Sequence, residues 1–67
     1  MGYNLKTYFI DRISKHYNTI TSTSDPQELI RARNRFLEVV KIGIDLGILT
    51  DEDLLEYDDN ELYRDAN

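Results

Sequence analysis

The chain has 67 residues, with 8 lysines and arginines against 13 aspartates and glutamates, a formal net charge of -5. It has no cysteine, which excludes disulfides and thiolate zinc sites, and its single histidine argues against an imidazole-rich metal centre. Because a chain of this size buries only about 60% of its unfolded surface, we expect one small domain over residues 1–67 that self-associates.

The absence of any apolar run longer than three residues argues against a membrane span or a signal peptide. We therefore expect a cytoplasmic protein. Its charge is unevenly distributed: residues 1–47 carry seven basic and five acidic side chains, whereas residues 48–67 carry one arginine and eight acids. Such asymmetry indicates that the last third differs in kind from the rest.

The first predicted helix covers residues 4–18, with Asn4 as its N-cap. Apolar residues recur at three- and four-residue spacing, which places them on one helix face; they are Leu5, Tyr8, Phe9, Ile13, Tyr17 and Ile20. The stretch from Thr19 to Ser24 is rich in hydroxyl side chains, and we expect a loop there.

The second predicted helix covers residues 26–46. Asp25 is its expected N-cap, Pro26 stands at the first helical position, and Glu28 completes a capping-box pattern. Gly47 fits the position just beyond the C-cap. Gly43 lies inside the helix, where glycine is unfavourable, so we expect another backbone to pack closely there.

A third, shorter and acidic helix is expected from residue 51, with Thr50 as its N-cap and acids in its first turn. Leu54, Leu55 and Tyr57 supply its apolar side. The pattern weakens over residues 58–67, which are expected to fray or to restart as a short turn. With no strand alternation, the fold class is all-α: a small three-helix domain.

The apolar face of the second helix is unusually wide. Ala32, Val39 and Leu46 widen it beyond a normal stripe, and Ile42 falls outside it. This predicts an oligomer seam made of Val39, Ile42, Gly43 and Leu46. The alternative is that the first and third helices flank the second helix from both sides.

Polar residues also occur within or beside the apolar faces. Arg33 projects into the apolar arc of the second helix and needs a carboxylate or carbonyl partner, or else must extend from the edge of the core to water. Arg12 and His16, four residues apart, either frame a small polar site with Tyr8 or Tyr17 or simply lie at a helix edge.

No motif for catalysis, cofactor binding or metal binding is present. Ser14 and His16 lie two residues apart and face different directions on a helix, so they do not form a nucleophile–base pair. The acidic residues fail the spacing of a calcium-binding EF-hand loop. We expect no enzymatic activity, no catalytic residue, no cofactor and no metal.

Two charged surfaces suggest partners. Arg31 and Arg35 share a helix face and could contact nucleic-acid phosphates, although the isoelectric point near 4.6 argues against an autonomous DNA-binding protein. The acidic segment could dock on a basic protein, or imitate nucleic-acid phosphates in a basic groove. Its expected contact residues are Asp51, Asp53, Glu56, Tyr57, Asp58, Asp59, Glu61 and Tyr63, joined in the acidic array by Glu52 and Asp65.

From the sequence we therefore expect a non-catalytic protein-interaction module or regulator, in its sharpest form an inhibitor that presents its acidic surface to a basic protein. The alternatives are a nucleic-acid-binding accessory protein that uses Arg31 and Arg35, and a purely structural oligomer subunit.

Overall fold

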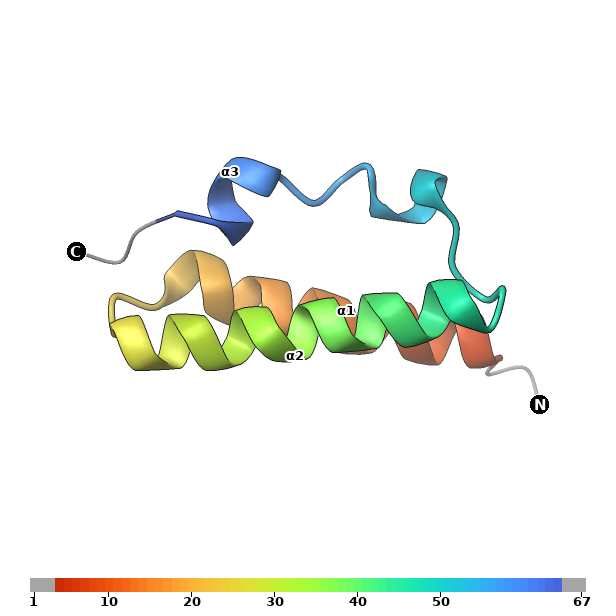
Figure 1. The fold of residues 1–67 in the computed structure, drawn as a ribbon, viewed down its shortest axis with the longest axis horizontal. Coiled ribbons are helices and arrows are strands. Elements are labelled where there is room, and N and C mark those ends of the chain that lie inside the picture. Colours follow the sequence, from red (N-terminus) through yellow and green to blue (C-terminus); the bar gives the residue numbers. More distant parts are fainter. Residues whose placement is uncertain (1–3, 65–67) are drawn as a thin grey trace.

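The computed structural model describes residues 4–64, and every regular element in that range is helical. The helices α1 (Leu5–Ser22) and α2 (Pro26–Asp45) form an antiparallel hairpin, and the rest of the chain returns along it (Figure 1). We call residues 48–64 the C-terminal segment. It contains η1 (Asp51–Leu54), a turn of 3-10 helix, and α3 (Asp59–Leu62), a turn of α-helix. The all-α prediction is confirmed.

The helix α1 begins as expected but ends later. The Asn4 side chain accepts a hydrogen bond from the Thr7 N–H at 2.8 Å, which confirms the N-cap. The predicted end at Asn18 is wrong, because the helix continues to Ser22. The hydroxyls of this last turn donate to carbonyls three or four residues earlier, and Ile20 is fully buried. Packing therefore overrides the loop-like composition.

The start of α2 is confirmed at Asp25, whose carboxylate accepts a hydrogen bond from the Gln27 N–H at 3.1 Å. The predicted capping box takes a different form. Glu28 accepts a hydrogen bond from the Thr23 hydroxyl, not from the Asp25 backbone. The Asp25 N–H donates instead to Thr23 Oγ1 at 3.1 Å. The Thr23 hydroxyl therefore links the Asp25 backbone to the Glu28 side chain.

The end of α2 is a Schellman motif. Gly47 has a φ of 73°, in the left-handed region that glycine adopts without a steric cost. The Ile48 N–H donates to the Gly43 carbonyl at 2.8 Å, and the Gly47 N–H donates to the Ile44 carbonyl at 3.0 Å. The predicted role of Gly47 is confirmed.

The predicted third helix is interrupted. Its start is confirmed, because Asp53 Oδ2 accepts a hydrogen bond from the Thr50 N–H at 2.9 Å. The helix stops after one turn and restarts at α3, where Asp58 accepts from the Asn60 N–H at 2.9 Å. On one continuous helix, Tyr57 and Leu62 would lie about 140° apart. The break lets both side chains face the hairpin, and both are buried.

The hydrophobic core lies where α1, α2 and the C-terminal segment meet. At its centre the Tyr57 ring lies 5.0 Å from the Tyr17 ring and 5.5 Å from the Phe36 ring, measured between centroids. The core residues are Phe9, Ile13, Ile20, Leu29, Ala32, Phe36, Leu49, Tyr57 and Leu62. Thus α1 and the C-terminal segment both pack against the apolar face of α2, as in the alternative to an oligomer seam, but Ile42 and Leu46 remain exposed.

Gly43 belongs to this intramolecular packing. A Cβ at this position would lie 2.7 Å from Leu49 Cγ and 3.1 Å from Phe9 Cδ2. The close approach expected there is therefore made by side chains of the same chain, not by a second backbone. None of the helices in the described part of the chain is long and apolar enough to span a membrane.

Candidate protein-interaction surface

The C-terminal segment is held against α2 by Arg33. Its Nε donates to the Leu62 carbonyl at 2.6 Å, and its Nη2 donates to the Arg64 carbonyl at 3.1 Å. The guanidinium also lies 5.5 Å from the centre of the Tyr63 ring, within the range of a cation–π contact. Within residues 4–64, the partners of Arg33 are therefore the Leu62 and Arg64 carbonyls and an aromatic ring, with no carboxylate among them.

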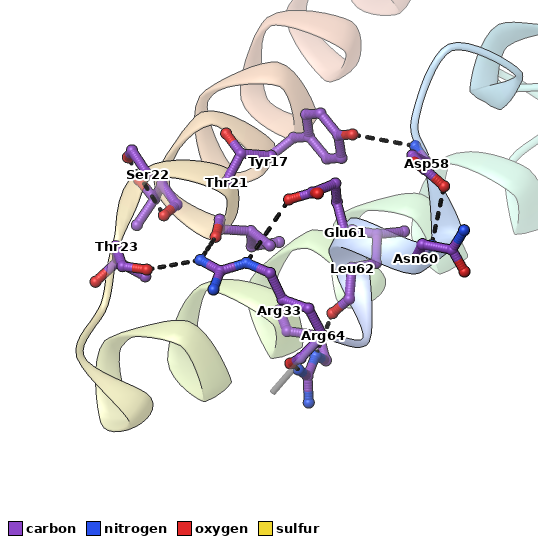
Figure 2. Close-up of polar contacts among 12 residues, drawn as sticks. Tyr17, Thr21, Ser22, Thr23, Arg33, Asp58, Asn60, Glu61, Leu62 and Arg64 are labelled. Atoms are coloured by element: carbon purple, nitrogen blue, oxygen red, sulfur yellow. Dashed lines mark hydrogen bonds and ion pairs between the residues drawn. The ribbon is translucent and has the colours of Figure 1, made fainter. Parts of the chain in front are cut away.

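A second arginine, Arg64, ties the same segment to the end of α1 (Figure 2). Its Nη2 donates to the Thr23 carbonyl at 2.6 Å and to the Ile20 carbonyl. Its Nε makes no hydrogen bond within residues 4–64 but lies 3.7 Å from Glu61 Oε1. A cation at a helix C-terminus is favourable because the last carbonyls lack partners. The last turn of α1 has no basic residue of its own, so Arg64 supplies that charge.

Two tyrosines complete the attachment. The Tyr57 hydroxyl lies 2.7 Å from Ser14 Oγ, and the Asp58 N–H donates to the Tyr17 hydroxyl at 3.1 Å. Tyr57 is only 9% exposed, so it is mainly a core residue, whereas the sequence led us to expect an exposed anchor for a partner. Ser14 is bonded to Tyr57, and the structure does not bring it together with His16.

Two of the acidic residues are used within the chain. Asp53 Oδ1 lies 3.1 Å from Lys6 Nζ. The hydrogen bond from the Thr50 backbone, and then the contact with Lys6, lower the pKa of Asp53 below its usual value. Glu61 is half-buried beside Arg64. Asp65, also expected in the array, lies outside the described residues.

The remaining acids of the C-terminal segment face solvent. None of them forms an ion pair within residues 4–64, and all are exposed. We define the acidic surface as these five residues: Asp51, Glu52, Glu56, Asp58 and Asp59. The carboxylates are thus carried on backbone that the arginines and tyrosines hold in place, while the charges themselves stay unneutralised.

An apolar side chain lies within this acidic surface. Leu55 is 79% exposed and lies three residues after Glu52 and directly before Glu56. A shallow concavity of about 580 Å³ follows the same stretch, lined by residues 54–60. Tyr63, another expected contact residue, is 60% exposed. Leu55 is one of the residues expected on the apolar side of the predicted third helix, and the break after η1 leaves it exposed.

A second charged feature lies between α1 and α2. A pocket of about 200 Å³ is lined by His16, Thr19, Glu28, Arg31, Ala32 and Arg35; we call it the basic pocket. The exposed Arg31 and Arg35, expected to contact nucleic acid, therefore meet a histidine from the other helix.

Charge and burial act together on His16. Partial burial, followed by the charges of Arg12, Arg35 and Lys15, lowers the pKa of His16 below its ordinary value. The Arg12 guanidinium lies 5.8 Å from the centre of the Tyr8 ring. Of the two tyrosines expected beside Arg12 and His16, Tyr8 is in contact with Arg12, whereas the Tyr17 hydroxyl is bonded to the C-terminal segment.

The residues expected to form an oligomer seam do not share one environment. Ile42 is 46% exposed and Leu46 is 64% exposed, whereas Val39 is half-buried and Gly43 is buried. Sequence reasoning missed a second exposed row on α2. It has heptad spacing and consists of Ile30, Leu37 and Ile44.

No protein-family model matches the chain, and no curated protein or solved structure is significantly similar to it. Among the described residues, no group of three histidine, aspartate or glutamate side chains is placed to hold a metal ion.

Proposed function

We propose that the chain is a non-catalytic protein-interaction module that presents its acidic surface to a basic protein partner. The observation that carries this proposal is the way the C-terminal segment is fixed. Arg33 and Arg64 bind main-chain carbonyls, so the exposed carboxylates keep their charge while the backbone beneath them is ordered. An ordered segment loses less conformational entropy on binding than a free acidic tail.

Charge supports the same proposal. The C-terminal segment contains seven acidic residues and one arginine, and five of the acids form no ion pair inside the described part of the chain. A dense field of one sign steers a partner of opposite sign and raises its association rate. Exposed Leu55 adds an apolar centre inside a charged rim, which is the usual arrangement of a protein interface.

The sharpest form of this function is inhibition of a nucleic-acid-handling protein. Carboxylates held on ordered backbone can occupy a groove that otherwise takes phosphates. In that case a basic protein captured by the immobilised chain should also bind DNA-cellulose. Free wild-type chain should then displace that protein from the DNA-cellulose. A partner that binds the chain and DNA at the same time would exclude this form and leave the interaction module.

The test compares two double variants with the same net charge. E52K/E56K reverses two charges of the acidic surface, and E38K/D45K reverses two exposed acids of α2. Immobilised wild type and the E38K/D45K control should retain the same basic protein from host lysate, and E52K/E56K should lose it. Equal loss by both variants would mean that only net charge matters and would refute the proposal.

A third variant tests contact and not charge. Leu55→Ser leaves the net charge unchanged and removes an exposed side chain, so the fold should be unaffected. We expect retention of the same partner to fall at least tenfold. Full retention would show that attraction is only long-range and that the concavity of residues 54–60 is not the contact.

A further inference from the structure

The basic pocket gathers positive charge in a protein that is acidic overall. Arg31 and Arg35 from α2 meet His16 from α1 there, and neither arginine forms an ion pair or a hydrogen bond within residues 4–64. The one carboxylate in the lining is that of Glu28, which accepts a hydrogen bond from the Thr23 hydroxyl. The guanidinium groups of this pocket therefore have hydrogen-bond donors without a partner among those residues, and little negative charge faces them.

The physical cost of this arrangement is visible at His16. Three cations contribute to lowering its pKa: Arg12 and Lys15 from α1, and Arg35 from α2. The imidazolium form is disfavoured first by partial burial and then by repulsion from these cations. A bound anion would reverse this balance.

The size of the pocket restricts the anion. A volume of about 200 Å³ is below the range of about 300–1,000 Å³ that suits drug-sized ligands. Guanidinium groups present planar pairs of donors that match the oxygens of a phosphate. We propose that the basic pocket binds one phosphate group, with Arg31 and Arg35 as donors from α2 and His16 as the donor from α1.

The geometry favours an isolated phosphate group over a nucleic-acid backbone. Arg31 and Arg35 are one turn apart and converge with His16 on one pocket, whereas a duplex requires a row of cations that follows its phosphates. Glu28 lines the same pocket, and the exposed Glu38 follows along α2. An extended polyanion would meet both carboxylates, whereas a single phosphate in the pocket would meet Glu28 alone.

The experiment uses the only histidine as a reporter. The imidazole Hε1 signal of His16 is followed by proton NMR from pH 5 to 8, in sodium chloride and in sodium phosphate of equal ionic strength. Bound phosphate should raise the pKa of His16 relative to chloride. The same titration with O-phosphoserine shows whether a phosphomonoester or free phosphate binds more tightly. Identical titrations in all three solutions would overturn the proposal.

Substitutions separate the pocket from net charge. Arg35→Gln and Arg31→Gln should each weaken phosphate binding by about tenfold or more, as expected for one lost charged hydrogen bond. Lys41→Gln removes the same charge from an exposed position of α2 outside the pocket and should leave the affinity unchanged. Equal weakening by all three would show an adventitious ion only.

Two further arms complete the test. A 20-base-pair duplex should bind no more tightly than inorganic phosphate does. Tight duplex binding with a steep salt dependence, and no phosphate effect on His16, would assign the surface to nucleic acid and overturn the pocket. The proposal is independent of the acidic surface, so E52K/E56K should bind phosphate as wild type does.

Discussion

Arg33→Met is the substitution that most directly tests how the C-terminal segment is held. Methionine keeps an unbranched apolar stem against α2 but cannot donate to the Leu62 and Arg64 carbonyls, at 2.6 and 3.1 Å in the wild type. It also removes the cation above the Tyr63 ring. The change therefore removes the polar attachment and conserves most of the packing.

The magnitude follows from those two bonds. A hydrogen bond from a charged group contributes about 1.5–3 kcal/mol. Arg33 is only half-buried, so water can hydrogen-bond to part of the carbonyl groups that the substitution leaves without a donor. We therefore expect the free energy of docking to fall by about 2 kcal/mol in total. That corresponds to about a 30-fold change in the docking equilibrium. It also predicts a fall in melting temperature of about 8–16 °C for a domain of this size.

Hydrogen exchange gives the decisive measurement, because it locates the loss. The amides of Glu61, Leu62 and Tyr63 donate to the Asp58 and Asp59 carbonyls at the start of α3, and their exchange should accelerate about 30-fold in Arg33→Met. The matched control is Arg31→Met, which removes the same group two residues earlier from an exposed position. If both variants lose the same protection and stability, Arg33 does not hold the segment and the reasoning is refuted.

Three further predictions test the core, the pH response and self-association. Gly43→Ala should lower the free energy of unfolding in urea by about 1–2 kcal/mol, because overpacking against Leu49 outweighs the helix-propensity gain of about 1 kcal/mol; a stabilised variant would show that Leu49 moves aside. The folded-state pKa of His16 lies below the unfolded value of 6.5, so the unfolded chain binds more protons. Its contribution to stability is therefore full above pH 6.5 and is lost as pH falls toward the folded pKa, and His16→Gln should remove that slope between urea titrations at pH 5 and 7. If the chain forms a dimer through the expected seam, light scattering should show that Ile42→Glu dissociates it, whereas Ile44→Glu, equally exposed on another side of α2, should not; a wild-type monomer at tens of micromolar, or equal effects of both variants, would contradict the seam.

Local chemistry was enough to predict the hairpin. Asn4, Asp25 and Gly47 each act within one turn of their own position, through caps that depend on neighbouring backbone atoms. For that reason the sequence alone indicated where α2 starts and ends. The end of α1 could not be predicted in this way, because Ile20 is buried by contacts from distant residues and its neighbours are typical of loops.

The candidate site was predictable in composition but not in geometry. The acidic residues were evident from the charge of residues 48–67, but the roles of individual side chains depended on the break between η1 and α3. That break leaves Leu55 exposed while Tyr57 is buried, although one continuous helix would place both on its apolar side. The sequence did offer one indication that Arg64 has a specific role, because it is the only basic residue among the last twenty.

The attachment of the C-terminal segment separates its order from its charge. Had Arg33 and Arg64 paired mainly with aspartates and glutamates, docking would have neutralised the carboxylates that give the segment its character. They bind the carbonyls of Ile20, Thr23, Leu62 and Arg64 instead, and among the acids of residues 4–64 only Glu61 lies beside one of them. Reversal of the exposed acids should therefore alter binding without undoing the fold, whereas loss of Arg33 should release the segment with all its charges intact.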